Sequence, residues 1–223
     1  MYRITGAIFD LDGTLIDSMF VWTECYSMVL NRYFQVTYAD LDKAMAEKLD
    51  TAPVTIGIPM LCEYFRSPID PQQIIEEING YFYQFYHFEV QLKDGVRALL
   101  EHLHQKGVKM CVASASSPES VRAALAHCKI DSYFDTVLTC DEIGKSKEHT
   151  DIYESALARL QTPKESTWVF EDAVIAIRTS HRMGLPIVGI YDAGQKEQEE
   201  IQSLSTVYLA KGESHTALIP YFD

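Results

Sequence analysis

The sequence predicts an α/β fold, a doubly wound parallel sheet that carries an inserted helical segment. Three observations predict it. Short apolar runs alternate with amphipathic helical stretches through residues 91–223, which is typical of a parallel sheet covered on both faces. A further apolar run precedes them at residues 4–9. Between these two parts, residues 17–90 read as almost wholly helical, and 223 residues are enough for one large domain with an insert.

The elements of the sheet region follow from the apolar pattern and from residues that end helices. Each expected strand is a short apolar run, and each expected helix has one apolar face. Gly107 and Gly184 stand where two of the helices should stop. Strands are expected at 4–9, 108–113, 137–139, 167–170, 186–191 and 206–209, and helices at 95–106, 119–127, 149–160 and 173–182.

The predicted domains are a core of residues 1–16 and 91–223 and a helical domain of residues 17–90. The helical domain is rich in aromatic residues. An aromatic ligand pocket is one interpretation, but the spacing of Ile74, Ile78 and Phe82 favours the core of a small helical domain. The domain can fold back over the ends of the strands, with its two connections to the core as hinges.

Composition restricts the class of protein. Hydrophobic residues make up 47% of the chain and charged residues 23%, as in an ordinary globular protein. The net charge of −13 argues against a nucleic-acid partner. No apolar run approaches a membrane span, so no membrane partner is expected. The five cysteines are scattered without a Cys-x-x-Cys pair. We therefore expect a cytoplasmic protein with reduced thiols and no zinc, and favour a monomer.

The first apolar run ends in two carboxylates, Asp10 and Asp12, followed by Gly13. Neighbouring like charges repel, and a cation such as Mg²⁺ relieves the repulsion because it prefers oxygen ligands. One carboxylate can attack a substrate while the other moves protons. An acidic turn without chemistry is the alternative, because Asp and Gly are common turn residues.

Two further strand ends carry polar groups that suit a phosphate. Ser114 to Ser117 follow the run at 108–113, and a hydroxyl with successive backbone N–H groups can hold phosphate there. A helix-cap or turn serine is the alternative for Ser114. Lys147 can supply a fixed cation, although it is otherwise a surface lysine and Lys145 is a close competitor.

The run at 167–170 ends in a second acidic pair, Glu171 and Asp172. One acidic pair is weak evidence for a site. Two acidic pairs that end two apolar strands of one α/β chain are much stronger, because ligands bind beyond the carboxyl ends of parallel strands. Together the pairs offer the oxygen-rich surroundings that Mg²⁺ favours.

With these motifs in place, the chain resembles the haloacid dehalogenase superfamily, in its phosphatase and phosphomutase branch with a helical cap. The resemblance covers essentially the whole chain. Asp10 to Leu15 is similar to the first motif of the family, and Val112 to Ser116 to the second. Lys147 stands four residues before Asp151, as in the third motif, and Phe170 to Asp172 is similar to the fourth. The resemblance implies a Rossmann-like core, 1–16 with 91–223, and a C1-type helical cap, 17–90.

The chain departs from the family pattern at four positions. Glu148 and Thr150 replace the two prolines of the third motif, without changing the register of the lysine. Ala173 and Ala176 replace a serine and a glycine after the acidic pair, so the following helix can pack slightly differently.

The resemblance also implies roles. Asp10 would attack phosphorus and form an aspartyl-phosphate, and Asp12 would protonate the leaving group and then activate water. Ser114, the backbone at Ala115 and Lys147 would hold the phosphoryl oxygens. The implied substrate is a small phosphorylated metabolite, and the implied cofactor is Mg²⁺. Its implied ligands are Asp10, the backbone carbonyl of Asp12 and Asp172, with Glu171 nearby through water.

Three functions follow, and a phosphatase is favoured. A phosphomutase that resembles β-phosphoglucomutase is the runner-up, but Trp22 replaces its histidine and residues 49–55 lack its arginine. The helical domain does contain other basic residues that leave a different second phosphate site open: Arg32, Lys43, Lys48 and Arg66. A catalytically silent binding protein is disfavoured because no catalytic position is lost. A phosphonate-cleaving relative is disfavoured because Asp12 is present. The sequence does not name the substrate. The best guesses for substrate contacts are Asp17, Met19, Phe20 and Trp22.

Overall fold

The computed structural model describes residues 1–51 and 54–222, so residues 52 and 53 of the stretch at 49–55 lie outside the described part. Internal contacts divide the chain into two compact units. The larger, here called the sheet unit, comprises Met1–Met19 and Tyr86–Asp223. The smaller, the helical unit, comprises Phe20–Phe85. Each is described by itself.

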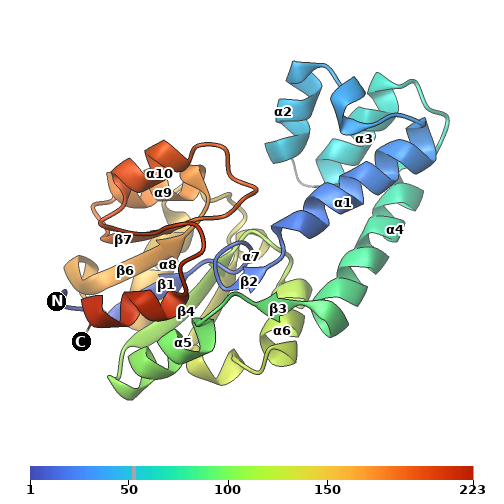
Figure 1. Ribbon diagram of the computed structural model, residues 1–223. Coiled ribbons are helices and arrows are strands. Elements are labelled where there is room, and N and C mark those ends of the chain that lie inside the picture. The colour runs from blue at the N-terminus through green and yellow to red at the C-terminus, as the bar shows by residue number, and fades with distance from the viewer. Residues whose placement is uncertain (52–53, 223) are drawn as a thin grey trace. The chain divides into compact units, whose positions relative to one another are not determined.

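The sheet unit is built on six parallel strands in the order β5-β4-β1-β6-β7-β8 (Figure 1). The runs that form them are apolar and almost wholly buried, as expected for a sheet with both faces covered. The predicted α/β class is confirmed, and the observed ends differ from the expected ones by one or two residues. The strands are β1 (Gly6–Phe9), β4 (Lys109–Ser114), β5 (Thr136–Thr139), β6 (Thr167–Glu171), β7 (Ile187–Ile190) and β8 (Val207–Leu209).

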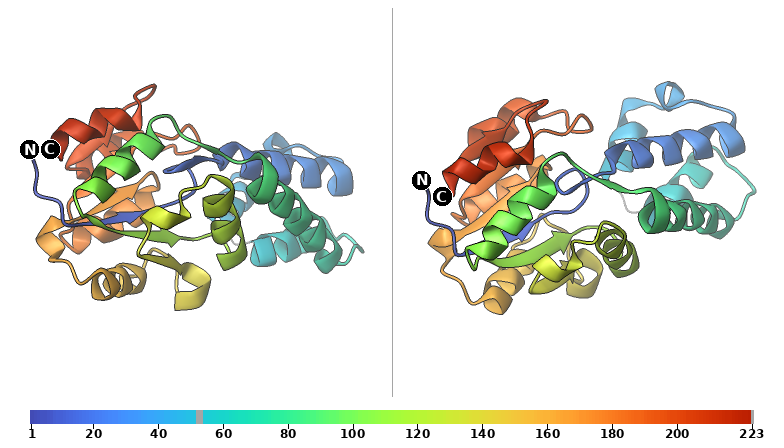
Figure 2. Two further views of the ribbon diagram at one scale, coloured as in Figure 1. Left: turned by 90° about the horizontal axis from the view of Figure 1, so that it is seen from below. Right: turned by 60° about the horizontal axis from the view of Figure 1, so that its bottom comes forward.

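Helices connect these strands and cover both faces of the sheet (Figure 2). On one face, Ile8, Cys111 and Val169 of three strands form a buried cluster with Ile152 and Tyr153 of α8. The helices are α5 (Val96–Gln105), α6 (Pro118–His127), α7 (Cys140–Ile143), α8 (Asp151–Leu160), α9 (Val174–Arg182) and α10 (Gln198–Leu204), with 3-10 helices at Asp131–Tyr133, Lys164–Ser166 and His215–Tyr221.

The opposite face carries aromatic side chains. Phe9 and Phe170 of the two central strands stack with their ring centroids 4.2 Å apart. Phe222, which follows the last 3-10 helix, packs on Phe170 at 5.9 Å. Helix α5 contacts that 3-10 helix. Aromatic packing therefore fixes the central strands from this face while α8 fixes them from the other.

The order of the strands reverses between β1 and β6. From β1 the chain goes on to β4 on one side, whereas from β6 it goes on to β7 on the other. The two strands are in register, Phe9 with Phe170, and the backbone N–H of Asp10 donates to the carbonyl of Phe170 at 2.9 Å. Such a switch point is where open α/β sheets bind their ligands, beyond the carboxyl ends of the strands.

The connections to the helical unit form a small sheet that the sequence analysis did not predict. β2 (Ile16–Asp17) pairs antiparallel with β3 (Gln91–Leu92). Both had been expected only as hinge segments. Two residues per strand are too few to give a detectable alternation in sequence.

The helical unit is helical over most of its length and buries the apolar face that its sequence predicts. Ile74, Ile78 and Phe82 are buried, and Phe82 packs on Trp22 with ring centroids 4.4 Å apart. Among the described residues, no helix is both long and apolar enough to cross a bilayer. The helices are α1 (Met19–Val29), α2 (Lys43–Thr51), α3 (Val54–Tyr64) and α4 (Pro71–Gln84), with π-helical segments at Leu30–Phe34 and Phe85–Glu89 and a 3-10 helix at Tyr38–Asp40.

Candidate active site

Asp10 and Lys147 form a buried ion pair at the switch point. The ammonium of Lys147 donates to Asp10 Oδ1 in a short contact and to Glu171 Oε2 at 2.8 Å. Lys147 comes from the loop between α7 and α8, and the two acids come from the ends of β1 and β6. All three residues are more than nine-tenths buried. Three motifs far apart in the sequence therefore meet at one point.

The two candidate lysines lie in different surroundings. Lys145 is exposed and pairs with Asp151 at the start of α8, with Nζ 2.8 Å from Oδ1. Lys147 is buried against the two strand-end carboxylates. The geometry therefore favours Lys147 over Lys145 as the cation of the site.

Fixed donors hold the acidic pair of β6. Glu171 Oε1 accepts from the backbone N–H groups of Asp172 and Ala173, at 3.2 and 3.1 Å. Asp172 accepts from the Thr14 hydroxyl at 3.2 Å and from the Gln195 amide at 3.3 Å. Sequence reasoning missed Thr14 as a supporting residue although it lies in the first motif, and Gln195 gave no signal because it lies in an irregular loop.

Gly13 makes room for Asp172. Its φ is +82°, in the left-handed region that favours glycine. A Cβ at this position would lie 2.4 Å from Asp172 Oδ2. The glycine of the first motif is therefore required twice, for the turn after β1 and for the close approach of the carboxylate from β6.

Burial and mutual repulsion shift the acids toward their protonated forms. Burial, followed by the charge of Glu171, raises the pKa of Asp10 to about 8 in spite of Lys147. Burial, Glu171 and Asp10 raise the pKa of Asp172 well above its ordinary value. Burial lowers the pKa of Lys147, but Asp10 and Glu171 outweigh burial and raise it above its ordinary value. Lys147 therefore stays charged, and the three acids, when ionised, carry more negative charge than one ammonium can balance.

This excess of negative charge fits a divalent cation. Oxygen atoms of Asp10, Glu171 and Asp172 all lie within 4.8 Å of one another and are buried. Carboxylate oxygens in such a group are the ligands that Mg²⁺ prefers. A bound cation would also remove the repulsion that raises the pKa values of Asp10 and Asp172.

Asp12 is held by three hydroxyl groups and lies apart from the acidic group. Ser18 Oγ donates to Asp12 Oδ1 at 2.7 Å, and Tyr86 OH donates to the same oxygen at 2.6 Å. Ser116 Oγ donates to Oδ2 at 2.7 Å. The sequence analysis predicted none of these contacts. Ser116 lies in the second motif, but Ser18 and Tyr86 carry no motif of their own.

The loop after β4 holds the candidate phosphate-binding residues. Ser114 ends β4, next to β1, and is fully buried, and its hydroxyl accepts from the backbone N–H of Ser116 at 3.0 Å. Ala115 is exposed in the same turn. The helix cap of α6 is Ser117, which accepts from the N–H of Ser120. Ser114 is therefore a turn serine and not a helix cap, and its hydroxyl remains next to β1 at the switch point.

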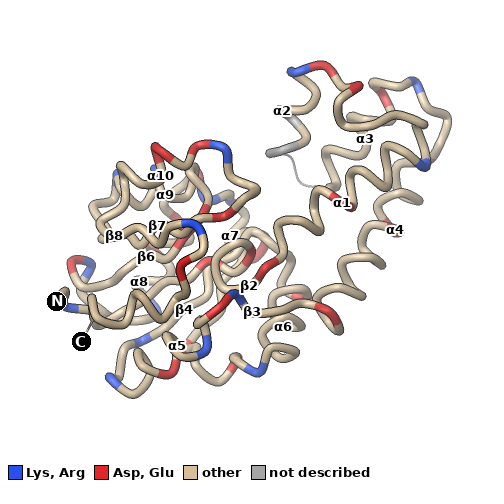
Figure 3. Tube along the Cα trace, viewed as in Figure 1, with Lys and Arg blue, Asp and Glu red and all other residues tan. Residues whose placement is uncertain are grey.

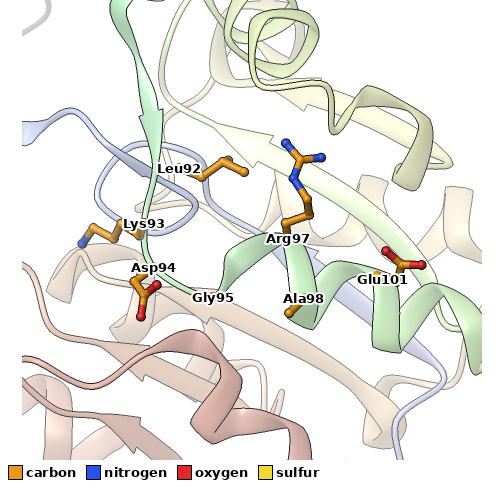
Figure 4. A pocket seen from close by; sticks show the side chains of 7 residues that line it. All are labelled: Leu92, Lys93, Asp94, Gly95, Arg97, Ala98 and Glu101. Carbon is orange, nitrogen blue, oxygen red and sulfur yellow. The ribbon is translucent and has the colours of Figure 1, made fainter.

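A second cationic group lies beside Asp172. Lys93, which follows β3, is 2.7 Å from Asp192 Oδ2, and the same Asp192 accepts from the N–H of Gly194 at 2.8 Å. Lys93 also borders an open hollow at the start of α5 (Figure 4). In the figure its side chain points away from that of Arg97, which is bound to the carbonyls of Cys128 and Lys129.

The proposed substrate contacts near the first motif lie in different places. Asp17 is exposed in β2, and Met19 belongs to the sheet unit beside Gly194. Phe20 is half exposed and packs edge-on against Phe85 of the helical unit. Trp22 is partly buried and packs on Phe82 of the same unit. Acidic and basic positions are interspersed along the trace (Figure 3).

Known proteins are similar to this chain in sequence and fold. The family model of the haloacid dehalogenase-like hydrolases matches residues 7–190. The pyrophosphatase PpaX of Anoxybacillus flavithermus is 30% identical over 191 residues, which is 84% of each chain. A phosphorylated carbohydrates phosphatase of Thermotoga maritima is 24% identical over 180 residues, 81% of this chain and 82% of that one. The crystal structure of CbbY from Rhodobacter sphaeroides in complex with phosphate superposes with a TM-score of 0.74 at 21% identity, covering 92% and 93% of the two chains.

Proposed function

The chain belongs to the family of haloacid dehalogenase-like hydrolases, and we propose that it is a Mg²⁺-dependent phosphatase acting on a small phosphorylated metabolite through an aspartyl-phosphate on Asp10. Membership confirms the family and the class of enzyme that the motifs predicted. We also propose that residues 1–16 and 91–223 form the catalytic core and residues 17–90 the cap, with the residue roles and the Mg²⁺ ligands given below.

One observation carries the proposal. Asp10 is a buried carboxylate in contact with a buried ammonium, at the switch point of a parallel sheet, with two further carboxylates beside it. A carboxylate can attack an anionic phosphate only where cations cancel the repulsion. Lys147 supplies one such charge. Asp10, the backbone carbonyl of Asp12 and Asp172 would hold the metal, with Glu171 nearby, and bound Mg²⁺ would polarise the phosphoryl oxygens.

The reaction has two steps with balanced proton transfers. In the first, an oxygen of Asp10 bonds to phosphorus, the ester P–O bond breaks, and Asp12 gives its proton to the leaving oxygen. In the second, Asp12 takes a proton from water as the water oxygen bonds to phosphorus and the acyl-phosphate bond to Asp10 breaks. Lys147 balances charge on the phosphoryl oxygens, and Ser114 with the backbone at Ala115 orients them.

The relatives support a phosphate ester or a phosphoanhydride as substrate. One is named a pyrophosphatase and another a phosphatase of phosphorylated carbohydrates. We favour hydrolysis over phosphomutase chemistry because a phosphomutase needs a second phosphate-binding site, which is normally cationic. Trp22, in place of the histidine of the phosphomutases, is packed on Phe82 and offers no cation.

The substitution Asp10→Asn tests the nucleophile. The amide is nearly isosteric with the carboxylate but is a poor nucleophile, so we expect turnover to fall by roughly 10³-fold or more with the fold intact. The assay is phosphate release from a panel of phosphorylated metabolites and pyrophosphate with Mg²⁺. EDTA should abolish activity, and added Mg²⁺ should restore it. The matched control is Asp131→Asn, an exposed aspartate of the 3-10 helix Asp131–Tyr133. Most of the activity surviving in Asp10→Asn would exclude the proposed mechanism.

The same panel separates hydrolysis from transfer. β-Glucose 1-phosphate with a bisphosphate primer should release inorganic phosphate faster than it forms glucose 6-phosphate. The reverse order of rates would favour the phosphomutase.

A further inference from the structure

The orientation of Asp12 depends on residues outside the four motifs. Its Oδ1 accepts two hydrogen bonds, from Ser18 Oγ and from Tyr86 OH, while Oδ2 accepts one from Ser116 Oγ. Ser18 precedes the helical insert, and Tyr86 is the residue at which the chain re-enters the sheet unit. Both ends of the insertion therefore supply a donor to the same oxygen atom.

The surroundings of Tyr86 favour its hydrogen bond to Asp12. It is 2% exposed and is among the largest fully buried side chains. It lies in the π-helical segment Phe85–Glu89, and π-helical turns are uncommon and frequent at functional sites. A buried phenol must find a partner for its hydroxyl, and here that partner is a carboxylate, which makes the hydrogen bond charge-assisted.

The uneven distribution of donors distinguishes the two oxygens of Asp12. A protonated carboxyl group carries its proton on one oxygen and keeps the other as an acceptor. Oδ1 already accepts two hydrogen bonds, so the proton belongs on Oδ2. The hydroxyl of Ser116 can rotate and accept from that proton, since a serine hydroxyl is both donor and acceptor. No change at Oδ1 is then required.

We infer that Tyr86 is a positioning residue for proton transfer by Asp12, holding Oδ1 together with Ser18 so that Oδ2 exchanges the proton. The inference rests on the proposed function. In the first step the Oδ2–H bond breaks, its proton goes to the leaving oxygen, and the electron pair of the ester P–O bond goes to that same oxygen. In the second step Oδ2 regains a proton from the attacking water. Tyr86 acts in this inference only through its hydrogen bond to Asp12 Oδ1.

The test is the dependence of kcat/KM on the leaving group in Tyr86→Phe, which removes the hydroxyl and keeps the buried ring. The substrates are phosphate monoesters from p-nitrophenyl phosphate to simple alkyl phosphates, and kcat/KM reports the step that transfers the phosphoryl group to Asp10. Poor leaving groups need the proton most. We therefore expect the loss to be roughly tenfold larger for an alkyl phosphate than for p-nitrophenyl phosphate, part of the roughly 10²- to 10⁴-fold that a positioned acid contributes.

Two further variants make the test specific. Ser18→Ala should also make kcat/KM depend more steeply on the leaving group. This variant replaces Tyr86→Phe in the test if Tyr86→Phe does not fold. Tyr64→Phe is the matched control, because it removes a hydroxyl that donates to a carboxylate at 3.0 Å, that of Asp42 in the helical unit. It should leave the leaving-group dependence unchanged.

The outcomes separate this inference from the proposed function. An equal loss for all leaving groups, or wild-type behaviour of both Tyr86→Phe and Ser18→Ala, would overturn the positioning role alone. If the Asp10→Asn variant hydrolysed the same esters at the wild-type rate, the proposed function would be overturned, and this inference with it.

Discussion

Asp12 and Glu171 each belong to an acidic pair that ends a strand of the sheet, yet different kinds of group hold the two carboxylates. At the end of β1, Asp12 accepts hydrogen bonds from three hydroxyls, those of Ser18, Tyr86 and Ser116. At the end of β6, Glu171 accepts from the ammonium of Lys147 and from two backbone N–H groups. Hydroxyls can both donate and accept, whereas ammonium and backbone N–H groups only donate.

This difference bears on the roles proposed above. Ammonium and backbone N–H donors fix the carboxylate of Glu171 in place, which suits the proposed neighbour of a cation. Hydroxyls that can both donate and accept suit the proton transfer proposed for Asp12. Lys147 joins the two ends, because it contacts Asp10 of the first and Glu171 of the second. The predictions below test this comparison, beginning with the group that the two ends share.

The largest effect is expected for the shared lysine. Lys147→Ala should lower kcat/KM by roughly 10²-fold or more, the scale of losing one fixed donor to the transition state. It also leaves Asp10 and Glu171 without their ammonium partner, so the stability of the variant should depend more strongly on Mg²⁺. The matched control is Lys145→Ala, which removes an exposed ion pair with Asp151 and should stay within about twofold of wild type. Steady-state kinetics of the two variants decide the assignment, and the opposite ranking would contradict it.

The metal-free protein should lose stability as the pH rises. The pKa values of Asp10 and Asp172 are raised in the folded state above their ordinary value of 3.8, to about 8 for Asp10. The folded state therefore binds protons that the unfolded state has released. This contribution to stability is complete at low pH and is lost as the pH rises toward 8. In EDTA, the free energy of unfolding should fall between about pH 5 and about pH 8.

Two measurements attribute this slope to the acidic group. Mg²⁺ should restore stability most at the alkaline end, because it binds the folded state. Asp172→Asn should flatten the slope in EDTA and weaken the stabilisation by Mg²⁺, as read from denaturant titrations. A slope that is equally steep in Asp172→Asn would place its origin elsewhere in the chain.

The fold was predictable because many residues along the chain contribute to the pattern that indicates it. Each strand of the large sheet is an apolar run, and the four helices expected in the sheet region, α5, α6, α8 and α9, each bury an apolar face, so small errors at the ends did not change the topology. The antiparallel pair β2–β3 was missed because two residues per strand leave no pattern. The π-helical turn at Phe85–Glu89 was missed because the spacing of Phe82 and Phe85 continues the preceding helix.

The site was predictable only where its residues belong to motifs. The structure brings Asp10, Lys147, Glu171 and Asp172 together, as the shared edge of parallel strands requires. Supporting residues such as Tyr86 and Gln195 lie in connections, where neither periodicity nor spacing relates a side chain to its distant partner. Such contacts depend on tertiary packing, which one sequence does not reveal.

A buried histidine that is not one of the strand-end acids should give a pH dependence of the opposite sign. His215, in the last 3-10 helix, is 2% exposed, and its Nδ1–H donates to the carbonyl of Asp94 at 3.1 Å. Burial lowers the pKa of His215 from 6.5 to about 4. Below about pH 6.5 the histidine therefore binds a proton in the unfolded state but not in the folded state. The free energy of unfolding decreases as the pH is lowered from about 6.5 to about 4.

Comparing wild type with His215→Gln isolates this contribution. Between about pH 6.5 and about pH 4, wild type should lose up to about 3 kcal/mol more unfolding free energy than the variant, since one pKa unit corresponds to about 1.4 kcal/mol. The matched control is His127→Gln, at an exposed position of α6, which should follow wild type. Removing the histidine should leave the alkaline loss of stability in EDTA intact, because that loss arises at the strand ends. If His215→Gln also abolished the loss of stability at rising pH in EDTA, the histidine and the strand-end acids would be coupled. The strand-end carboxylates could then not be the only source of that loss.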